Sequence, residues 1–495
     1  MNNIQTLIPV FIFLAVMIII GFYASKKQKA SGGVQKEYFL GSQNLGGLVL
    51  AMTFVATYGS VSSFVSGPGV AWNLGYGWVV FAAPQIITGF LLLGFVGKKM
   101  AMLSFKTGAF TVTDLLYRRF DSKLLTVILS IVLLVFFTAM IVGQFIGGAQ
   151  IFSAITGLDY KLGLLLFASV TVLYTSGGFK AVVITDAICA ILMLIGMFTL
   201  AYTILDAGGG IDNINATLAA TNVKDGVSTN FSVNAGGALP FTLLFSAWLL
   251  VGFCTIGLPQ SLVRCMSYKK TQELHKAMIV ATIICGALMI GVTLLGVLSR
   301  GVILDMPEKG TDSIIPTLIV TRMDPILAGI TIIGPLAATM STVSSLLIAA
   351  SSAVMRDLNY QLFPDRYEAI AQKKHLSISF TLFLGVISIV LATFPLDIIV
   401  WINMFAFGGL ETTFLWPIAL GLFFPFINKT GVLSGIIIGL SVYTLCTVFK
   451  VNLMGAHAIV VGTAVSFIAT VAGSFFGQKI DNKTMEIFFP HKVKA

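Results

Sequence analysis

The sequence predicts an all-α, polytopic membrane protein with about 13 transmembrane helices, and three observations support this prediction. The 495 residues are 57% hydrophobic and only 10% charged, whereas a soluble chain carries about 25% charged residues. The mean hydropathy is +0.96. Apolar runs of about 18 residues or more, long enough to cross a bilayer as helices, recur along the chain.

The apolar runs divide into thirteen predicted spans, and the first of them is expected to be a retained helix. Neither a basic segment nor a small-residue cleavage site accompanies the first run, so it lacks the pattern of a signal peptide. The predicted spans are roughly 4–23, 47–66, 76–96, 124–152, 160–176, 181–205, 240–263, 277–299, 325–352, 376–394, 398–424, 431–449 and 457–477.

The loops between the spans hold most of the basic residues, and these residues predict the orientation of the chain. With the N-terminus outside, 24 of the 30 Lys and Arg residues, Arg264 among them, fall in inside loops. This bias satisfies the positive-inside rule and predicts a cytoplasmic C-terminus. It also accounts for the net charge of +10, so the expected partner is the lipid bilayer and no nucleic acid is expected.

The second span is interrupted in its middle. Residues Ala56–Ser63 read Ala-Thr-Tyr-Gly-Ser-Val-Ser-Ser, and a glycine among small hydroxyl residues makes a poor continuous helix. Pro68, between Gly67 and Gly69, is expected to end the span. A broken helix in a membrane is tolerated where it lines a cavity or is buried in protein, and its freed carbonyls can bind a cation.

The seventh span repeats this character, because Gly252, Gly257 and Pro259 interrupt it near its inner end. Two interrupted segments at corresponding places in two halves of a chain indicate a transporter site. The two spans are five apart, the spacing of two five-helix repeats, and five is odd, so the second repeat would be inverted. The predicted division is 1–46 as first peripheral helix and cytoplasmic loop, 47–206 as first repeat, 207–239 as extracytoplasmic loop, 240–424 as inverted second repeat, and 425–495 as two peripheral helices and a short cytoplasmic tail.

A stripe of hydroxyl side chains lies in the ninth span. On a helix, Ala338, Ser341, Ser345 and Ser352 fall on one face, because the turn is about 100° per residue; Thr342 and Ser344 flank that face. Small hard cations take oxygen ligands, which favours a cation site. Ala and Ser also let membrane helices pack closely, and the stripe alone leaves both interpretations open.

Two carboxylates fall within predicted spans, where ionisable groups are functional hypotheses by default. Asp186 is either a cation ligand or an aspartate near the cytoplasmic interface. Glu411 is either functional or makes a structural hydrogen bond to freed backbone near Gly408. Gln144 in the fourth span is either a packing residue or a substrate contact, and Gln85 in the third span shares this ambiguity.

The remaining reactive residue types are scattered. The four histidines are isolated and the five cysteines have no paired spacing, so neither a metal cluster nor a disulfide is predicted. An enzyme embedded in the membrane would need converging His, Ser and Asp residues or a metal. We therefore predict that the chain is not an enzyme.

Four stretches resemble the sodium:solute symporter family, and the resemblance covers about residues 5–475. They are EYFLGSQNLGGLVLAMTFVATY (37–58), QFIGGA (144–149), IGLPQSLVRCMSYK (256–269) and AFGGLETTFLWPIALGLF (406–423). The resemblance implies an inverted-repeat core like that of the leucine transporter, in a carrier of the cell (inner) membrane that works as a monomer. It implies sodium-driven import of pantothenate or a similar anion by alternating access. Proline, a sugar or a sialic acid as substrate remains an alternative, as does proton coupling through Asp186 or Glu411.

The resemblance also implies ligands and contacts, carried over residue by residue. A first sodium would bind the carbonyls of Ala56, Gly59 and Ala338 and the hydroxyls of Ser341 and Thr342. A second sodium would bind Asp186, Ser341, Ser344 and Ser345. Substrate contacts would come from Tyr58, Ser60, Ser63 and Gln144.

Overall fold

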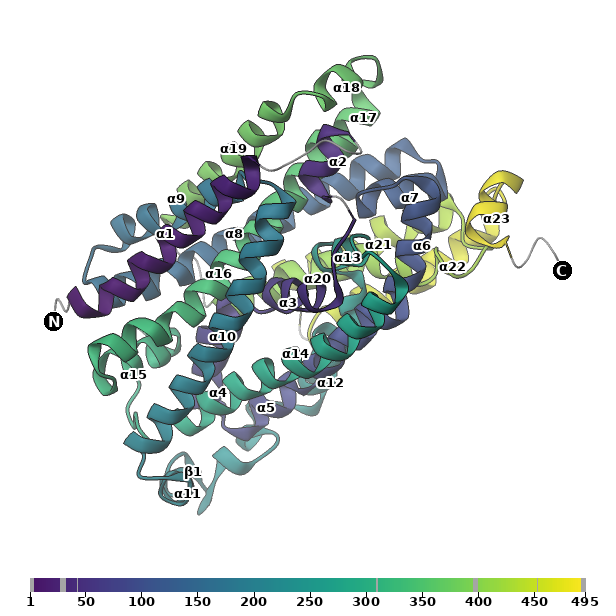
Figure 1. The fold of residues 1–495 in the computed structure, drawn as a ribbon. Coiled ribbons are helices and arrows are strands. Elements are labelled where there is room, and N and C mark those ends of the chain that lie inside the picture. The colour runs from purple at the N-terminus through teal and green to yellow at the C-terminus, as the bar shows by residue number, and fades with distance from the viewer. Residues whose placement is uncertain are drawn as a thin grey trace.

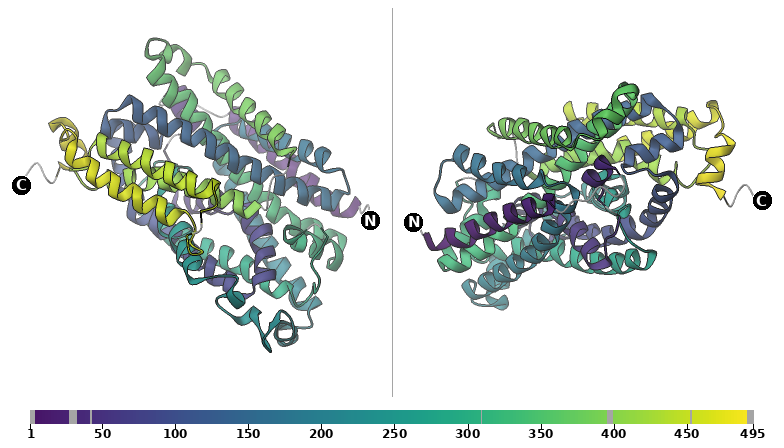
Figure 2. Two further views of the ribbon diagram at one scale, coloured as in Figure 1. Left: turned by 180° about the vertical axis from the view of Figure 1, so that it is seen from behind. Right: turned by 45° about the horizontal axis from the view of Figure 1, so that its top comes forward.

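Long helices lie side by side and form the bundle drawn in Figure 1. The computed structural model describes residues 4–26, 33–41, 43–308, 310–394, 399–451 and 453–490. The predicted features at residues 1–3, in the loop 27–32, at position 398 and in the tail 491–495 lie outside the described residues. The start of α1 (Ile4–Lys26) and the short helix α23 (Asn482–Phe488) lie at opposite ends of the bundle, as both views of Figure 2 also show.

The described residues contain one apolar helical segment at each of the thirteen predicted positions. Ten are continuous helical stretches long and apolar enough to cross a membrane, two are bent pairs of helices, and α9 is a shorter apolar helix. The prediction of an all-α polytopic membrane protein is confirmed. The segments are α1; α3 (Gly47–Tyr58) with η1 (Ser62–Ser66) and α4 (Gly67–Leu74); α5 (Tyr76–Ala82) through η2 (Ala83–Ile87) and η3 (Phe90–Gly97) to α6 (Lys98–Thr107); α8 (Lys123–Thr156); α9 (Tyr160–Thr175); α10 (Phe179–Ala207); α12 (Phe241–Leu250) with η6 (Phe253–Gly257) and α13 (Pro259–Cys265); α14 (Thr271–Ser299); α16 (Pro325–Ser352) with η8 (Ala353–Leu358) and α17 (Asn359–Leu362); α19 (Lys374–Ala392); α20 (Ile399–Ala419); α21 (Lys429–Val448); and α22 (Ile459–Phe476).

Short elements connect these segments. The region predicted as the loop 207–239 contains a helix and an antiparallel pair of two-residue strands, β1 with β2. The connecting elements are α2 (Val34–Phe39), α7 (Val112–Phe120), α11 (Ile211–Ala220), β1 (Val223–Lys224), β2 (Val227–Ser228), η4 (Thr229–Phe231), η5 (Ala235–Gly237), η7 (Thr311–Ser313), α15 (Ile314–Arg322), α18 (Pro364–Ala371) and α23.

Both predicted interruptions are present as sharp bends. The chain turns by 67° between α3 and the η1–α4 stretch, and by 48° between η6 and α13. The prediction that Pro68 ends the second span is wrong, because Pro68 stands in the first turn of α4 and the helix continues to Leu74. The turn before Pro68 is π-helical, with the Gly67 N–H donating to the carbonyl of Ser62, so the proline lies at an irregular turn within the stretch Ser62–Leu74.

Helix α16 lies at the centre of the bundle. In its most apolar stretch 83% of the residues are buried, against 33% in α1, α21 and α22. It packs against α8 and α10, and the approach to α10 is close because a Cβ atom on Gly196 would lie 2.9 Å from the carbonyl oxygen of Thr331. The hydroxyl stripe of α16 is therefore turned toward other helices and not toward lipid.

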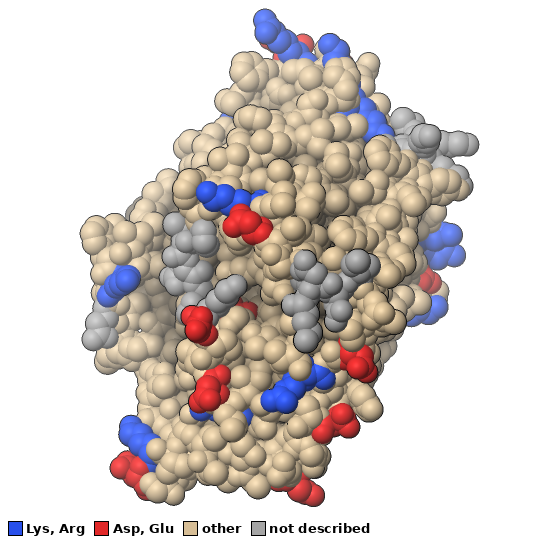
Figure 3. All heavy atoms as spheres, turned by 90° about the vertical axis from the view of Figure 1, so that its left-hand side faces the viewer, with Lys and Arg blue, Asp and Glu red and all other residues tan. Residues whose placement is uncertain are grey.

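Charged side chains are sparse on the surface. Figure 3 looks onto the end of the bundle at which α1 begins, and there acidic and basic side chains are interspersed among uncharged atoms. Large apolar side chains such as Phe198, Tyr202 and Phe241 are more than half exposed. In a membrane these side chains would face lipid.

Candidate functional site

The break after α3 brings together all five groups proposed for a first sodium. Ser341 Oγ donates to the carbonyl oxygen of Ala56 at 2.8 Å, and Thr342 Oγ1 donates to that of Gly59 at 2.9 Å. The carbonyl of Ala338 lies 3.2 Å from Ser341 Oγ and 2.9 Å from Thr342 Oγ1. All five residues are buried. The arrangement is a cluster of neutral oxygens of the kind that binds a small hard cation.

The carboxylate proposed for a second sodium lies on a third helix, α10, next to α3 and α16. Asp186 of α10 is fully buried, and its Oδ2 lies 3.5 Å from Ser345 Oγ. Ser344 Oγ donates to the backbone carbonyl of Ser341 at 3.0 Å within its own helix, so the structure brings Ser345, but not the Ser344 hydroxyl, to the carboxylate. The second oxygen of Asp186, Oδ1, has no hydrogen-bond partner among the described residues.

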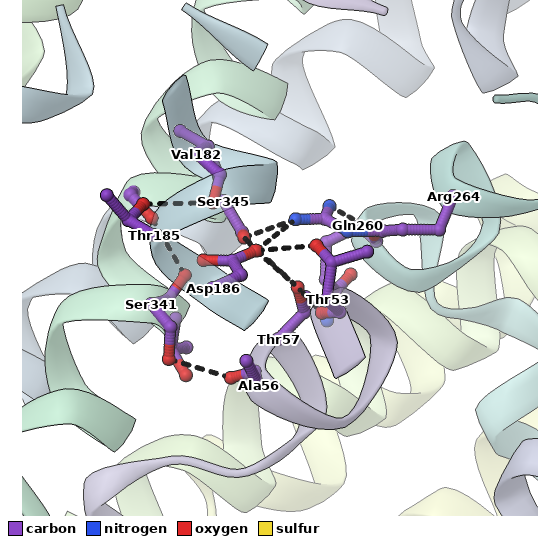
Figure 4. Close-up of polar contacts among 12 residues, drawn as sticks. Thr53, Ala56, Thr57, Val182, Thr185, Asp186, Gln260, Arg264, Ser341 and Ser345 are labelled. Atoms are coloured by element: carbon purple, nitrogen blue, oxygen red, sulfur yellow. Dashed lines mark hydrogen bonds and ion pairs between the residues drawn. The ribbon is translucent and has the colours of Figure 1, made fainter. Parts of the chain in front are cut away.

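Two threonines that the sequence reasoning missed complete the surroundings of this carboxylate (Figure 4). Thr53 Oγ1 donates to Asp186 Oδ2 at 2.7 Å, and Thr57 Oγ1 lies 3.5 Å from the same atom and 3.1 Å from Ser345 Oγ. Thr53 and Thr57 are four residues apart on α3, so they share a face. That spacing was the signal in the sequence that could have found them.

Arg264 was also misplaced by the sequence reasoning. It was predicted to lie in an inside loop, but its side chain is only 2% exposed and lies within α13. Its Nη2 donates to Asp186 Oδ2 at 3.3 Å and to Ser345 Oγ, and its Nη1 donates to the carbonyl of Gln260 at 2.8 Å. The positive-inside count could not detect that Arg264 is buried. A basic residue at the end of an apolar run is counted as a loop residue whether its side chain is buried or exposed.

A cavity adjoins the break. Tyr58, Ser60 and Ser63, the proposed substrate contacts, line it, and so does Gln85. Ser60 and Ser62 share a hydrogen bond of 2.6 Å, and Asn403 of α20 donates to Ser62 at 3.0 Å. The other lining residues are Gly67, Trp78, Phe81, Ala82, Val251, Met289, Thr293, Val400, Met404 and Phe407.

Gln144 lies behind the break and not on the cavity wall. Its Oε1 accepts a hydrogen bond from the backbone N–H of Val61 at 2.9 Å, and its Nε2 has no partner among the described residues. Since Val61 is the residue at which the helix resumes after the break, this side chain satisfies an amide at the new helix N-terminus.

Glu411 is fully buried in α20, close to the second bend. A Cβ atom on Gly257 would lie 3.0 Å from the Glu411 Cα atom, so the backbones of η6 and α20 are in contact there. The structural alternative, a hydrogen bond to freed backbone, is not formed, because within the described residues neither Glu411 oxygen has a partner.

The comparisons with known proteins agree with this architecture. The family model described as the sodium:solute symporter family matches residues 38–439. The sodium/pantothenate symporter of Escherichia coli (strain K12) is 38% identical over 487 residues, which is 98% of this chain and 99% of that protein. The protein of the same name from Haemophilus influenzae is 38% identical over 483 residues, covering 97% and 98%.

Two solved structures share the fold. A Na+-coupled sialic acid symporter in a substrate-bound, outward-open state superposes with a TM-score of 0.80 at 20% identity, covering 97% of this chain and 100% of that one. Mhp1, a nucleobase-cation-symport-1 family transporter, superposes in a closed conformation with a TM-score of 0.57 at 14% identity, covering 91% and 97%. The fold is thus that of the leucine-transporter-like carriers. The chain belongs to the sodium:solute symporter family and is a sodium-coupled solute symporter, not an enzyme.

Removing a hydroxyl from the first cluster should weaken the response to sodium. We expect Ser341→Ala or Thr342→Ala to raise the half-saturating sodium concentration of uptake on the order of tenfold, the effect of losing one charge-assisted contact. Thr339→Ala is the matched control, because among the described residues Thr339 Oγ1 bonds to Pro335 of its own helix and to no other group. Wild-type sodium activation in both Ser341→Ala and Thr342→Ala would contradict a cation site here.

Cysteines placed on the cavity wall should react with a polar thiol reagent. Ser63→Cys is expected to be labelled faster than Ser60→Cys, because Ser63 is partly exposed and Ser60 is 3% exposed. Substrate should slow both reactions. Thr339→Cys, at a fully buried position, is the negative control. If neither Ser60→Cys nor Ser63→Cys is labelled in carriers of either orientation, these residues do not face the substrate path.

Proposed function

We propose that this carrier couples inward sodium flow to the uptake of pantothenate. The observation that carries the substrate assignment is the 38% identity, over almost the whole chain, to two proteins named sodium/pantothenate symporters. Relatives named sodium/proline symporters align at 28% identity or less. Proline, a sugar or a sialic acid are the substrates that the experiment below would distinguish.

The chemistry of the cavity suits such a substrate. Pantothenate combines a carboxylate, an amide and hydroxyl groups with a branched apolar part. Ser60, Ser63 and Tyr58 supply hydroxyl donors, and Trp78 and Phe81 supply an apolar wall. Gln144 does not line this cavity, so we propose that it supports the substrate site indirectly, by holding the backbone after the break through its Oε1.

Two sodium ions are proposed per cycle. The first would take the neutral oxygens of Ala56, Gly59, Ala338, Ser341 and Thr342. The second would take Asp186 and Ser345, with Ser341 and Ser344 beside them; a carboxylate in low dielectric attracts a cation more strongly than any hydroxyl, and the cation offsets the energetic cost of keeping the carboxylate charged.

Alternating access would carry ions and substrate past the broken helices, with the site held near the midplane while the helices around it rock. The proposed orientation has the N-terminus outside and the C-terminus in the cytoplasm of a cell (inner) membrane, and the proposed working unit is a monomer. An inside-negative potential would then favour each net positive charge entering by about 2.3 kcal/mol per 100 mV.

Uptake by the purified protein in liposomes tests the substrate and the coupling ion together. We expect labelled pantothenate to accumulate under an inward sodium gradient and not when choline replaces sodium at fixed pH. An excess of unlabelled proline or sialic acid should not compete. Accumulation driven by a proton gradient without sodium would instead establish the proton-coupled alternative, and competition by proline would overturn the substrate.

Charge movement during uptake tests the second ion. One sodium with one monovalent anion moves no net charge, whereas two sodium ions carry one positive charge inward. We therefore expect an inside-negative potential to accelerate wild-type uptake, and Asp186→Asn to remove most of this acceleration. Asp159→Asn, at an exposed helix N-cap where Asn also serves, should behave as wild type. If the rate of wild-type uptake does not depend on the membrane potential, the second sodium is not transported and Asp186 is structural.

A further inference from the structure

Arg264 lies against two of the groups proposed to bind the second sodium. Its Nη2 atom donates both to Asp186 Oδ2 and to Ser345 Oγ, so one guanidinium group bridges the carboxylate of α10 and the hydroxyl of α16 (Figure 4). A sodium ion bound through Asp186 Oδ2 and Ser345 Oγ would use the same two oxygen atoms. The arginine therefore occupies the position that such an ion would take.

The pairing between Arg264 and Asp186 is incomplete. A guanidinium and a carboxylate that form a permanent pair are commonly joined by two parallel hydrogen bonds of about 2.7–2.9 Å. Here a single nitrogen reaches a single carboxylate oxygen at 3.3 Å. Asp186 Oδ1 and Arg264 Nε have no partners among the described residues, although both are buried. A buried pair with unsatisfied atoms on both sides gains little from staying closed.

The charges at this position allow one cation at a time. Asp186 is the only acidic group that the structure joins to Arg264 within the described residues. A sodium ion beside a guanidinium that remained in place would put two positive charges on one carboxylate in a low-dielectric interior, where like charges repel strongly. Sodium and the guanidinium are therefore expected to exclude each other.

An aromatic ring and a small cavity lie next to the guanidinium. Its central carbon lies 5.7 Å from the centre of the Phe179 ring, and an aromatic face attracts a guanidinium. A small cavity beside it, lined in part by Phe39, Phe179 and Ser345, has room for about one water molecule. A shift of α13 is therefore needed to carry the charge away from Asp186.

We propose that Arg264 is a tethered cation that competes with the second sodium for Asp186 and Ser345. This inference rests on the proposed function. When the guanidinium occupies the position, it ties α13, the inner arm of the bent seventh span, to α10 and α16. When sodium takes the position, that tie is released. Occupancy of the second ion site is thereby linked to the freedom of a broken helix to move.

If Arg264 competes with sodium, removing it should increase the affinity for sodium. If Arg264 only stabilised the fold, its removal would not be expected to increase that affinity. A site that is competent only part of the time binds more weakly by that fraction. If the guanidinium holds the position about nine-tenths of the time, Arg264→Gln should lower the half-saturating sodium concentration about tenfold. Arg264→Lys, which keeps the charge on a single nitrogen, should lower it by a smaller factor.

The measurement is sodium-dependent thermal stabilisation of the full chain in lipid nanodiscs, with choline holding the ionic strength constant. Lys269→Gln is the matched control, because it removes one positive charge at an exposed position five residues further on. The double variant Asp186→Asn/Arg264→Gln should lose the gain in affinity, since it lacks the carboxylate. Sodium-driven uptake by the same variants gives a second reading of the half-saturating concentration.

The outcomes separate this inference from the proposed function. If sodium fails to stabilise the wild-type protein, the proposed sodium sites are wrong and the inference falls with them. If sodium stabilises the wild type but Arg264→Gln binds it no more tightly, the inference alone is overturned. Should Arg264→Gln not fold, Arg264→Lys decides: a half-saturating concentration equal to or above that of the wild type overturns the competition.

Discussion

The break in α3 leaves backbone carbonyls without helical partners inside the bundle, and the core of the molecule is arranged around these groups. In a continuous helix the carbonyl of Ala56 would accept from Ser60 and that of Gly59 from Ser63. Instead Ser341 and Thr342 of α16 donate to these two carbonyls. An unsatisfied backbone group in the membrane interior costs several kcal/mol, so the hydroxyl stripe of α16 and the break in α3 each require the other. The same oxygens are the proposed sodium ligands.

Much of this arrangement could be predicted from the sequence because it leaves local signals. The thirteen apolar segments, the two interruptions and the hydroxyl stripe are patterns of composition and spacing, and the structure has a helix or a bend at each. Pro68 was misinterpreted because a proline is compatible both with the end of one helix and with the first turn of the next. Only the three-dimensional path of the chain distinguishes these two roles.

The parts that could not be predicted are contacts between residues far apart in the chain. Nothing local to Arg264 shows that it meets Asp186, because 78 residues separate them. The contacts of Gln144 and Asn403 could not be predicted either. Each lies in an apolar helix where a polar residue has several uses, and the structure assigns one to the backbone of the unwound stretch and the other to Ser62. That neither oxygen of Glu411 has a partner among the described residues also has no signal in the sequence.

Polar side chains from three helices converge on the carboxylate of Asp186, which a fourth helix, α10, carries. Thr53 and Thr57 reach Asp186 from α3, Ser345 reaches it from α16 and Arg264 from α13 (Figure 4). Two of these four helices, α3 and α13, are the arms of the bent spans, whereas α10 and α16 are unbroken. Any rocking of the bent spans against the unbroken ones must therefore change the number of donors on Asp186. The binding energy of a cation at this position would change with that motion, because the cation and the donors share the oxygens of Asp186 and Ser345. This is how a fixed ion site, buried among rigid helices, can be coupled to the movement of the broken ones without a separate pathway between them.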